Sequence, residues 1–280
     1  MRLFFKTILY LLLFLLLTVL TQIGGLVFLL SWFIYRRIIK KATAHFKPVF
    51  LIKTLTFVSL YLFATFLLVP IIAKPFGRVP LPFFTTNHVR PVNVWTCILN
   101  RNYVRPELKS MVEKVAKTMN DRYEGTEMQY LDANLPFFDG FPLVPHLSHN
   151  DGRKLDLAFF YTNSGTGQKT NDKPSFSGYG VFEAPRPNEM NSIETCLKQG
   201  YWQYDGTKYL ALVARQEQFI FDEERTKAMI ELFSEAPGIE KMFLEPHLKT
   251  RLKLNGNNKV RFHGCQAVRH DDHLHIQIRR

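Results

Sequence analysis

Apolar residues are concentrated at the start of the chain. Residues 7–35 are almost all apolar and uncharged, and a second apolar run covers residues 49–73. Each run is longer than the roughly 20 residues that a helix needs to cross a bilayer. We therefore predict two membrane-spanning helices, with a possible kink at residues 22–25 of the first. Two separate short spans within 7–35 are disfavoured, because residues 26–35 alone are too short.

The segment between the two runs, residues 36–48, is rich in Lys and Arg. Short basic loops remain in the cytoplasm. Both chain termini, and everything after about Lys74, are therefore expected outside, although Arg2 and Lys6 oppose translocation of the N-terminus. The alternative is a cleaved signal peptide followed by one span, but no small-residue cleavage site is evident.

The rest of the chain has the pattern of a mixed domain. Residues 74–104 begin Pro-rich without helical periodicity, which indicates a linker after the anchor of residues 1–73. Helical spacing and strand-like runs then alternate in the order α, β, β, α, β, β, and residues 163–192 read as a long surface loop. This order predicts an α+β fold. The expected helices are 105–122 and 222–236, and the expected strands are 128–131, 153–161, 239–244 and 273–278.

Charge is distributed unevenly along the 280 residues. The formal net charge is +12, but residues 1–72 hold eight basic residues and no acid. The basic balance therefore reflects the membrane segment and gives no support for nucleic-acid binding. The three cysteines allow one disulfide in an oxidising compartment, Cys196–Cys265 being one guess, or three free thiols.

Six of the nine histidines fall in two short stretches, residues 146–156 and 263–275. In the first, His149 and Asp156 are separated by a Gly-containing turn, so that one precedes a strand and the other lies on it. In the second, His273 and His275 are two apart on an expected strand and share a face. A catalytic zinc takes three protein ligands and keeps a fourth position open. Asp272 and His273 are candidates to transfer the proton.

These stretches resemble a known family. The pattern H-x-S-H-x-x-G-x-x-x-D of residues 146–156 is similar to the first zinc motif of penicillin-insensitive murein endopeptidases, which are LAS-type metallopeptidases. The second stretch ends in H-x-H, as theirs does, with His270 three residues earlier. Residues 239–249 are similar to the strand-and-Pro segment before their last motif. Strong similarity covers about thirty residues, and weaker similarity covers 125–280; the pair of motifs is specific, whereas either alone is weak.

The resemblance implies a role for each residue of the two motifs. It implies a small antiparallel sheet with flanking helices, and Zn2+ held by His149, Asp156 and His275. His273 would be the general base or would stabilise the transition state. Asp272 is an alternative base or a group that orients a ligand histidine. Two further histidines would flank the metal and contact substrate or a second ion: His146 and His270.

The chain also departs from the family. Lys154 stands where those enzymes carry an inner acid, residues 163–205 have no counterpart, and a two-helix anchor is unusual for them. Other residues are expected to be structural or solvated. His263 and His247 are expected to be structural and Asp271 solvated, whereas the aromatic residues Tyr201, Trp202 and Tyr204 are expected to pack in the core rather than line a cleft.

Together these observations predict a zinc metallopeptidase domain over residues 105–280, anchored in the bacterial inner membrane and facing the periplasm. The expected substrate is a peptidoglycan stem or crosslink peptide, cleaved by an endopeptidase or by a D-Ala-D-Ala or L,D-carboxypeptidase. Two rival hypotheses are a non-catalytic zinc- and wall-binding module and a membrane metal sensor. The sequence names no protein partner.

Overall fold

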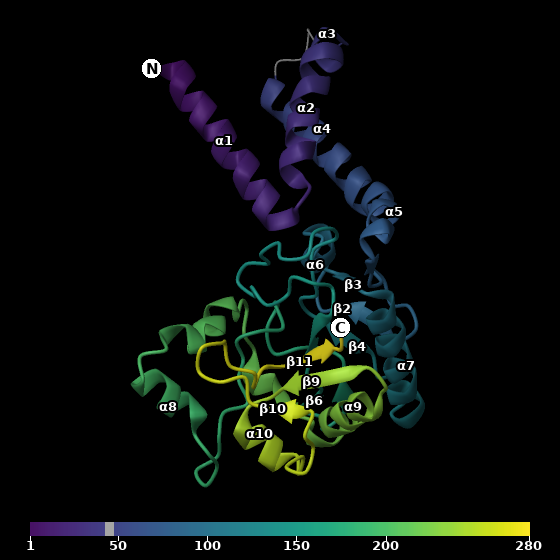
Figure 1. Ribbon diagram of the computed structural model, residues 1–280, viewed down its shortest axis with the longest axis vertical. Helices are drawn as coiled ribbons and strands as arrows, with labels where there is room; N and C mark the ends of the chain where they lie inside the picture. Colours follow the sequence, from purple (N-terminus) through teal and green to yellow (C-terminus); the bar gives the residue numbers. More distant parts are fainter. Residues whose placement is uncertain (43–47) are drawn as a thin grey trace.

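The computed structural model describes residues 1–42 and 48–280. It consists of a layer of long apolar helices and a mixed α+β domain beneath their ends (Figure 1). The predicted α+β class is confirmed. Two helical stretches are long and apolar enough to cross a membrane, Phe4–Thr21 and Val49–Ile72.

The first apolar run is two helices, not one. α1 (Arg2–Thr21) ends at Gln22, whose φ of 67° lies in the left-handed region, and α2 (Gly24–Ile34) turns back beside it. Glycine is required at this turn, because a Cβ at Gly25 would lie 2.1 Å from Thr18 Oγ1. The prediction of a single span over 7–35 is therefore wrong.

The reversal changes the place of the N-terminus. α2 continues through η1 (Tyr35–Ile39) into α3 (Lys40–Ala42), and Figure 1 shows the N-terminus at the same end as α3, away from the domain. The expectation that both termini lie on one side does not agree with this arrangement. The second run is helical as predicted and descends to the domain through α4 (Val49–Phe63), η2 (Ala64–Leu68) and α5 (Val69–Ile72).

Residues 74–104 are part of the domain, contrary to the linker prediction. After η3 (Lys74–Phe76), β1 (Val79–Pro80) pairs with β3 (Tyr103–Val104), and β2 (Val89–Pro91) joins the main sheet. The prolines are tolerated because β2 is an edge strand, where a missing N–H leaves no gap in the ladder. The short helix α6 (Trp95–Ile98) connects β2 to β3.

The main sheet has six strands in the order β10-β9-β11-β5-β4-β2. Its centre is antiparallel, and each edge strand runs parallel to its neighbour. The four predicted strand regions all contribute to it. The strands are β4 (Met128–Tyr130), β5 (Lys154–Ala158), β9 (Ile239–Phe243), β10 (Val260–Arg261) and β11 (His273–Ile278).

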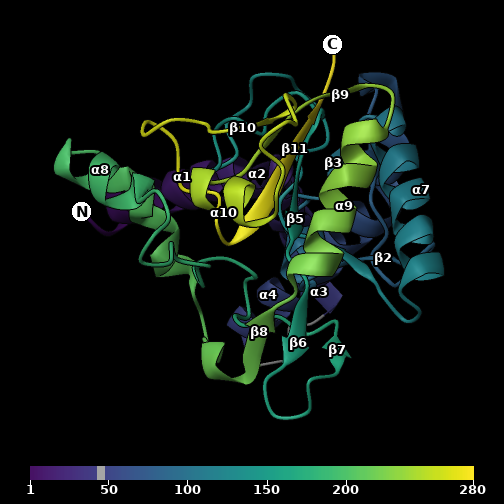
Figure 2. The ribbon, with the colours of Figure 1, turned by 90° about the horizontal axis from the view of Figure 1, so that it is seen from below.

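Two helices cover one face of this sheet. α7 (Pro106–Arg122) and α9 (Glu223–Glu235) lie side by side (Figure 2), and Asp222 caps α9 by accepting from the Arg225 N–H at 2.9 Å. The apolar side chains of β5 and β11 share a buried cluster with these helices: Leu155, Leu157, Leu274 and Ile276. Because side chains alternate along a strand, Asp156, His273 and His275 project from the other face.

The insert of residues 163–205 is more than a surface loop. A small second sheet is formed by β6 (Tyr161–Asn163), β7 (Lys169–Thr170) and β8 (Phe219–Phe221). The chain between β7 and α8 is irregular. Within that chain Tyr179 and Val181 are buried. The remaining helical elements are α8 (Ser192–Lys198), η4 (Trp202–Leu210), η5 (Gln216–Gln218) and α10 (Pro246–Arg251).

The cysteines pair as guessed. Cys196 of α8 and Cys265 form a disulfide that joins the insert to the segment between β10 and β11. Cys97 is a free, buried thiol. Burial raises the pKa of this thiol to about 11, so that it remains protonated at neutral pH.

Candidate metal centre

Strand pairing brings the two predicted motifs together. β5 and β11 are antiparallel neighbours, and in their register His275 lies directly opposite Asp156. His149 precedes β5 and reaches the same place through a turn in which Gly152 adopts φ 78°. All three side chains are buried, at 1% exposure for His149, 1% for Asp156 and 3% for His275.

Three donor atoms of these side chains converge. His149 Nε2 lies 3.2 Å from Asp156 Oδ1 and 3.1 Å from His275 Nδ1, and the last two atoms are 2.8 Å apart. Ligand bonds of 2.0–2.2 Å to a tetrahedral metal place neighbouring donors about 3.3 Å apart. The three atoms therefore lie close to the spacing of one face of such a tetrahedron.

The hydrogen bonding of His149 suits a metal ligand. Its Nδ1 lies 2.7 Å from the carbonyl oxygen of Ala133, which can only accept, so this nitrogen carries the proton. The lone pair is then on Nε2, the nitrogen that faces Asp156 and His275. A backbone carbonyl that fixes the tautomer and orientation of a histidine in this way is a common support of metal ligands.

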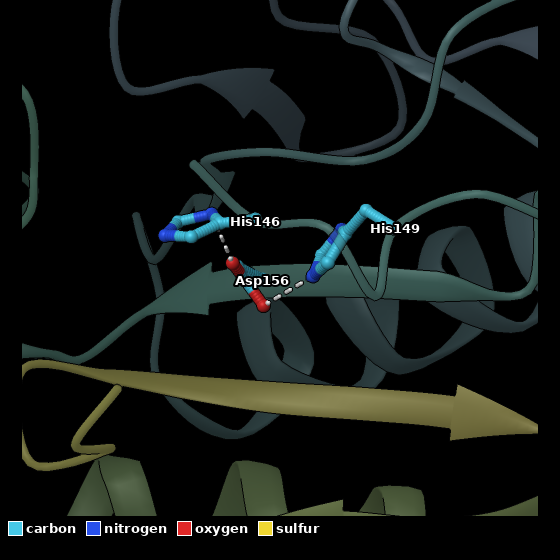
Figure 3. A group of neighbouring side chains, drawn as sticks. All are labelled: His146, His149 and Asp156. Atoms are coloured by element: carbon cyan, nitrogen blue, oxygen red, sulfur yellow. Dashed lines mark ion pairs between the residues drawn. The ribbon is translucent and has the colours of Figure 1, made fainter. Parts of the chain in front are cut away.

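His146 forms a second group with two of the same residues. His146, His149 and Asp156 are all buried, and their donor atoms lie within 4.8 Å of one another, so they can hold a metal ion (Figure 3). The Nδ1 of His146 lies 3.3 Å from Asp156 Oδ2 and 3.1 Å from Asp132 Oδ2. Its Nε2 is buried without a hydrogen-bond partner in the described structure, and such a nitrogen is available for a ligand.

The charges of the centre are strongly coupled. Burial opposes ionisation of Asp156, but His149 and His273 outweigh it and hold the pKa of this carboxyl well below its usual value. Burial, reinforced by His149 and His273, lowers the pKa of His275 to about 4. A carboxylate beside a neutral imidazole is the protonation state that a metal requires of its ligands.

His273 is held on the cleft side of the centre. Its Nδ1 makes a short hydrogen bond with Asp272 Oδ1, and its Nε2 lies 3.7 Å from Asp156 Oδ2. Although burial lowers the pKa of His273, the carboxylates of Asp156 and Asp272 raise it to about 9. The other oxygen of Asp272 accepts from the Gly180 N–H at 2.6 Å. Both oxygens of Asp272 are thus engaged, which favours it as a group that orients His273.

The other histidines of the chain differ in their surroundings, and not all of them lie where the sequence predicted. His270 is buried against His273, with ring centroids 5.0 Å apart, and its backbone N–H donates to Glu245 at 3.1 Å. His263 lies after β10 rather than on a strand, and its exposed ring lines the cleft. His247 is structural as expected, since its Nε2 donates to the Glu183 carbonyl at 2.7 Å. His45, which lies between the two apolar runs and outside both histidine stretches, is not among the described residues.

The prediction that Asp271 is solvated is wrong. Asp271 is fully buried and forms a bidentate pair with Arg269, with N–O distances of 2.7 and 2.5 Å. Burial outweighs this pairing and raises the pKa of Asp271 to about 7. The pair with Arg269 could not be predicted from the sequence, because two acids in a row between two histidines are typical of a solvated turn.

A cavity of about 550 Å³ opens over the candidate centre. Six histidines and Asp156 line it, and further walls come from residues 202–210 and 266–268. Trp202 lines this cleft with 78% of its surface exposed, contrary to the expectation of core packing, whereas Tyr204 is buried as expected. The disulfide connects the two walls, because Cys196 precedes one and Cys265 precedes the other.

Three residues of the centre were not identified from the sequence: Asp132, Arg101 and Tyr179. Asp132 follows β4, bridges to His146, and is itself paired with both Arg101 Nε and Nη2 at 2.7 Å. Tyr179 donates to Asp156 at 2.8 Å. Asp132 could have been suspected only from its position just after β4, the strand that pairs with β5. Tyr179 had none, since it lies in an irregular segment.

No protein-family model matches this sequence, and no curated protein matches it significantly.

Proposed function

We propose that this protein is a zinc-dependent peptidase, anchored in the bacterial inner membrane, that hydrolyses peptidoglycan stem or crosslink peptides. The observation that carries the proposal is the convergence of His149 Nε2, Asp156 Oδ1 and His275 Nδ1 at the base of a cleft. Two nitrogens and one carboxylate are the ligand set of a class of zinc peptidases. The resemblance of the two motifs to LAS-type metallopeptidases supports the same fold and substrate class.

The residues of the centre have separate tasks in this proposal. His149, Asp156 and His275 would hold the zinc, which supplies a Lewis acid and lowers the pKa of water. His273 moves a proton at Nε2, because its Nδ1 is occupied by Asp272 and the ring lines the cleft. His146 contributes an unpartnered Nε2 to the same cavity, toward the metal or the substrate.

The cleft favours cleavage within a chain over removal of its last residue. A carboxypeptidase needs a cation for the terminal carboxylate of its substrate, and Arg and Lys are the usual ones. Among the described residues that line this cavity, none is Lys or Arg; besides the histidines they are mostly neutral. An endopeptidase is therefore the first proposal, and a D-Ala-D-Ala or L,D-carboxypeptidase is the alternative.

Membrane placement follows from charge. The N-terminus and the basic residues of η1 and α3 lie at one end of the helical layer, and the domain lies at the other (Figure 1). Basic segments next to membrane helices remain in the cytoplasm. We therefore place the N-terminus in the cytoplasm and the domain in the periplasm, with Phe4–Thr21 and Val49–Ile72 as the two helical stretches long enough to cross.

A digest tests the activity. The full chain, purified in detergent, is incubated with peptidoglycan and with defined crosslinked muropeptides, with and without a zinc chelator. Chelator-sensitive loss of crosslinked dimers is expected, and loss of a terminal D-Ala alone would make the protein a carboxypeptidase. Tight, stoichiometric metal without any product would instead support the wall-binding module, and weak, readily reversible binding would support the metal sensor.

A further inference from the structure

The insert reaches the candidate metal centre through two consecutive residues, Tyr179 and Gly180. Both belong to the irregular chain between β7 and α8, and Tyr179 is 5% exposed. They contact two different carboxylates of the site, Asp156 and Asp272. Through these two contacts the insert supports side chains of the candidate metal centre.

The Tyr179 hydroxyl has a defined direction. The backbone N–H of Asp132 lies 3.2 Å from the phenol oxygen and can only donate to it. The single proton of the phenol is therefore free to donate to Asp156 Oδ2, which is 2.8 Å away. This bond engages one oxygen of Asp156, while Oδ1 is the oxygen that faces His149 and His275.

Gly180 supports the other half of the centre. Its N–H donates to Asp272 Oδ2 at 2.6 Å, and Asp272 Oδ1 holds the Nδ1 of His273. The residue must be glycine here, since its φ is 81° and a Cβ would lie 2.5 Å from the carbonyl oxygen of Thr207. One dipeptide thus fixes both the carboxylate of the metal side and the carboxylate of the proton-transfer side.

We propose that Tyr179 and Gly180 are positioning residues by which the insert sets the geometry of the metal centre: Tyr179 orients Asp156 so that Oδ1 points to the metal, and Gly180 orients Asp272 and hence His273. The proposal rests on metal binding at the centre but not on peptide cleavage. Partners of this kind around metal ligands influence affinity about 10–100-fold.

The test compares two tyrosine variants of the full chain in detergent. Tyr179→Phe removes the donor to Asp156. Tyr130→Phe is the matched control, because Tyr130 is also buried and donates to a carbonyl, that of Pro82 at 2.8 Å, outside the centre. Zinc affinity is measured by competition with a chromogenic chelator, and the coordination geometry is followed by the visible absorption of the cobalt-substituted protein.

Tyr179→Phe is expected to weaken zinc binding about 10–100-fold and to alter the cobalt spectrum. Tyr130→Phe should leave both unchanged. Equal affinities and spectra for Tyr179→Phe and the parent would overturn the proposal. Loss of fold in Tyr179→Phe would also overturn it, since the hydroxyl would then serve the fold and not the metal. A parent chain that binds zinc but cleaves no peptide would refute the proposed function alone.

Discussion

Asp156 and His275 face each other across two antiparallel strands, with Oδ1 of one 2.8 Å from Nδ1 of the other. This pairing depends on the register of β5 and β11, because a slip of one residue would turn either side chain toward the apolar face. The apolar side chains that alternate with them, three leucines and Ile276, are buried in the same cluster as α7 and α9, so the core itself fixes the register. The fold and the geometry of the candidate metal centre are therefore specified together.

Removing a predicted ligand should abolish tight metal binding. Asp156→Ala and His149→Ala each delete one of three convergent donors, and we expect zinc affinity to fall by at least about 100-fold, beyond the range seen for supporting residues. Zinc content after dialysis checks the result. His263→Ala, a histidine at the rim of the same cleft that makes no contact with the three donors, should retain stoichiometric zinc.

Removing the proton-transfer residue should separate binding from catalysis. His273→Ala is expected to lower muropeptide cleavage about 10²–10⁴-fold, the usual contribution of general acid–base groups. Zinc affinity should change little, because the three proposed ligands remain. Cleavage rates and zinc titrations on one preparation decide the matter, and retained activity would exclude His273 from the reaction.

The disulfide should stabilise the domain. The Cys196–Cys265 bond closes a separation of 69 residues, for which loop entropy predicts a contribution of about 4 kcal/mol. The double variant Cys196→Ser/Cys265→Ser should therefore unfold at a clearly lower temperature than the parent. Cys97→Ala is the comparison, since it removes the thiol outside the disulfide. Equal melting temperatures for the double variant and the parent would show that the disulfide does not stabilise the domain.

Glu183 should make stability depend on pH. Burial raises the pKa of this carboxyl to about 7, from 4.5 in the unfolded chain. The folded state then binds more protons than the unfolded state between these values, so stability is full below pH 4.5 and declines as the pH rises to 7. In Glu183→Gln this decline should shrink by about 1–2 kcal/mol. Urea unfolding at pH 4.5 and 7 compares the two chains, and parallel curves would refute the assignment.

The proposed topology can be read in intact cells. Arg2→Cys places a thiol before the first proposed span, Phe4–Thr21. Phe84→Cys places one on the surface of the domain, where Phe84 is 76% exposed. A membrane-impermeant maleimide should label the second and not the first until the cells are lysed. The parent chain gives the background, because its one free thiol is buried. Labelling of Arg2→Cys in intact cells would instead indicate that the N-terminus lies in the periplasm.

The sequence predicted the parts of the centre that follow from local periodicity. His273 and His275 share a face because they are two apart on a strand, and Asp156 is placed by its position on β5. Contacts between segments distant in the sequence could not be predicted from it. Tyr179 contacts Asp156 from an irregular insert, and Arg101 pairs with Asp132 from another loop. Asp271 was misjudged for the same reason, since its burial depends on a tertiary partner.

The apolar runs show the same limit. Their composition predicted helices, but a single left-handed residue, Gln22, determines that the first run reverses. A hydropathy profile is averaged over a window of residues, so it does not reveal the backbone conformation of a single residue such as Gln22. The linker prediction for 74–104 failed because prolines suggested an unpaired chain, whereas β2 pairs along one side only.

The tip of the α1–α2 hairpin rests on the domain. The side-chain oxygen of Gln22 accepts from the Phe137 N–H at 2.8 Å, and Tyr61 of α4 donates to the Ile98 carbonyl at 2.7 Å. The buried Arg78, which follows α5 and η3, donates to the carbonyl of Leu135 in the segment that leads to the candidate metal centre. If the apolar helices span the membrane as we propose, these contacts hold the cleft at a fixed distance from the lipid, and the proposed enzyme would act only on peptides within that reach.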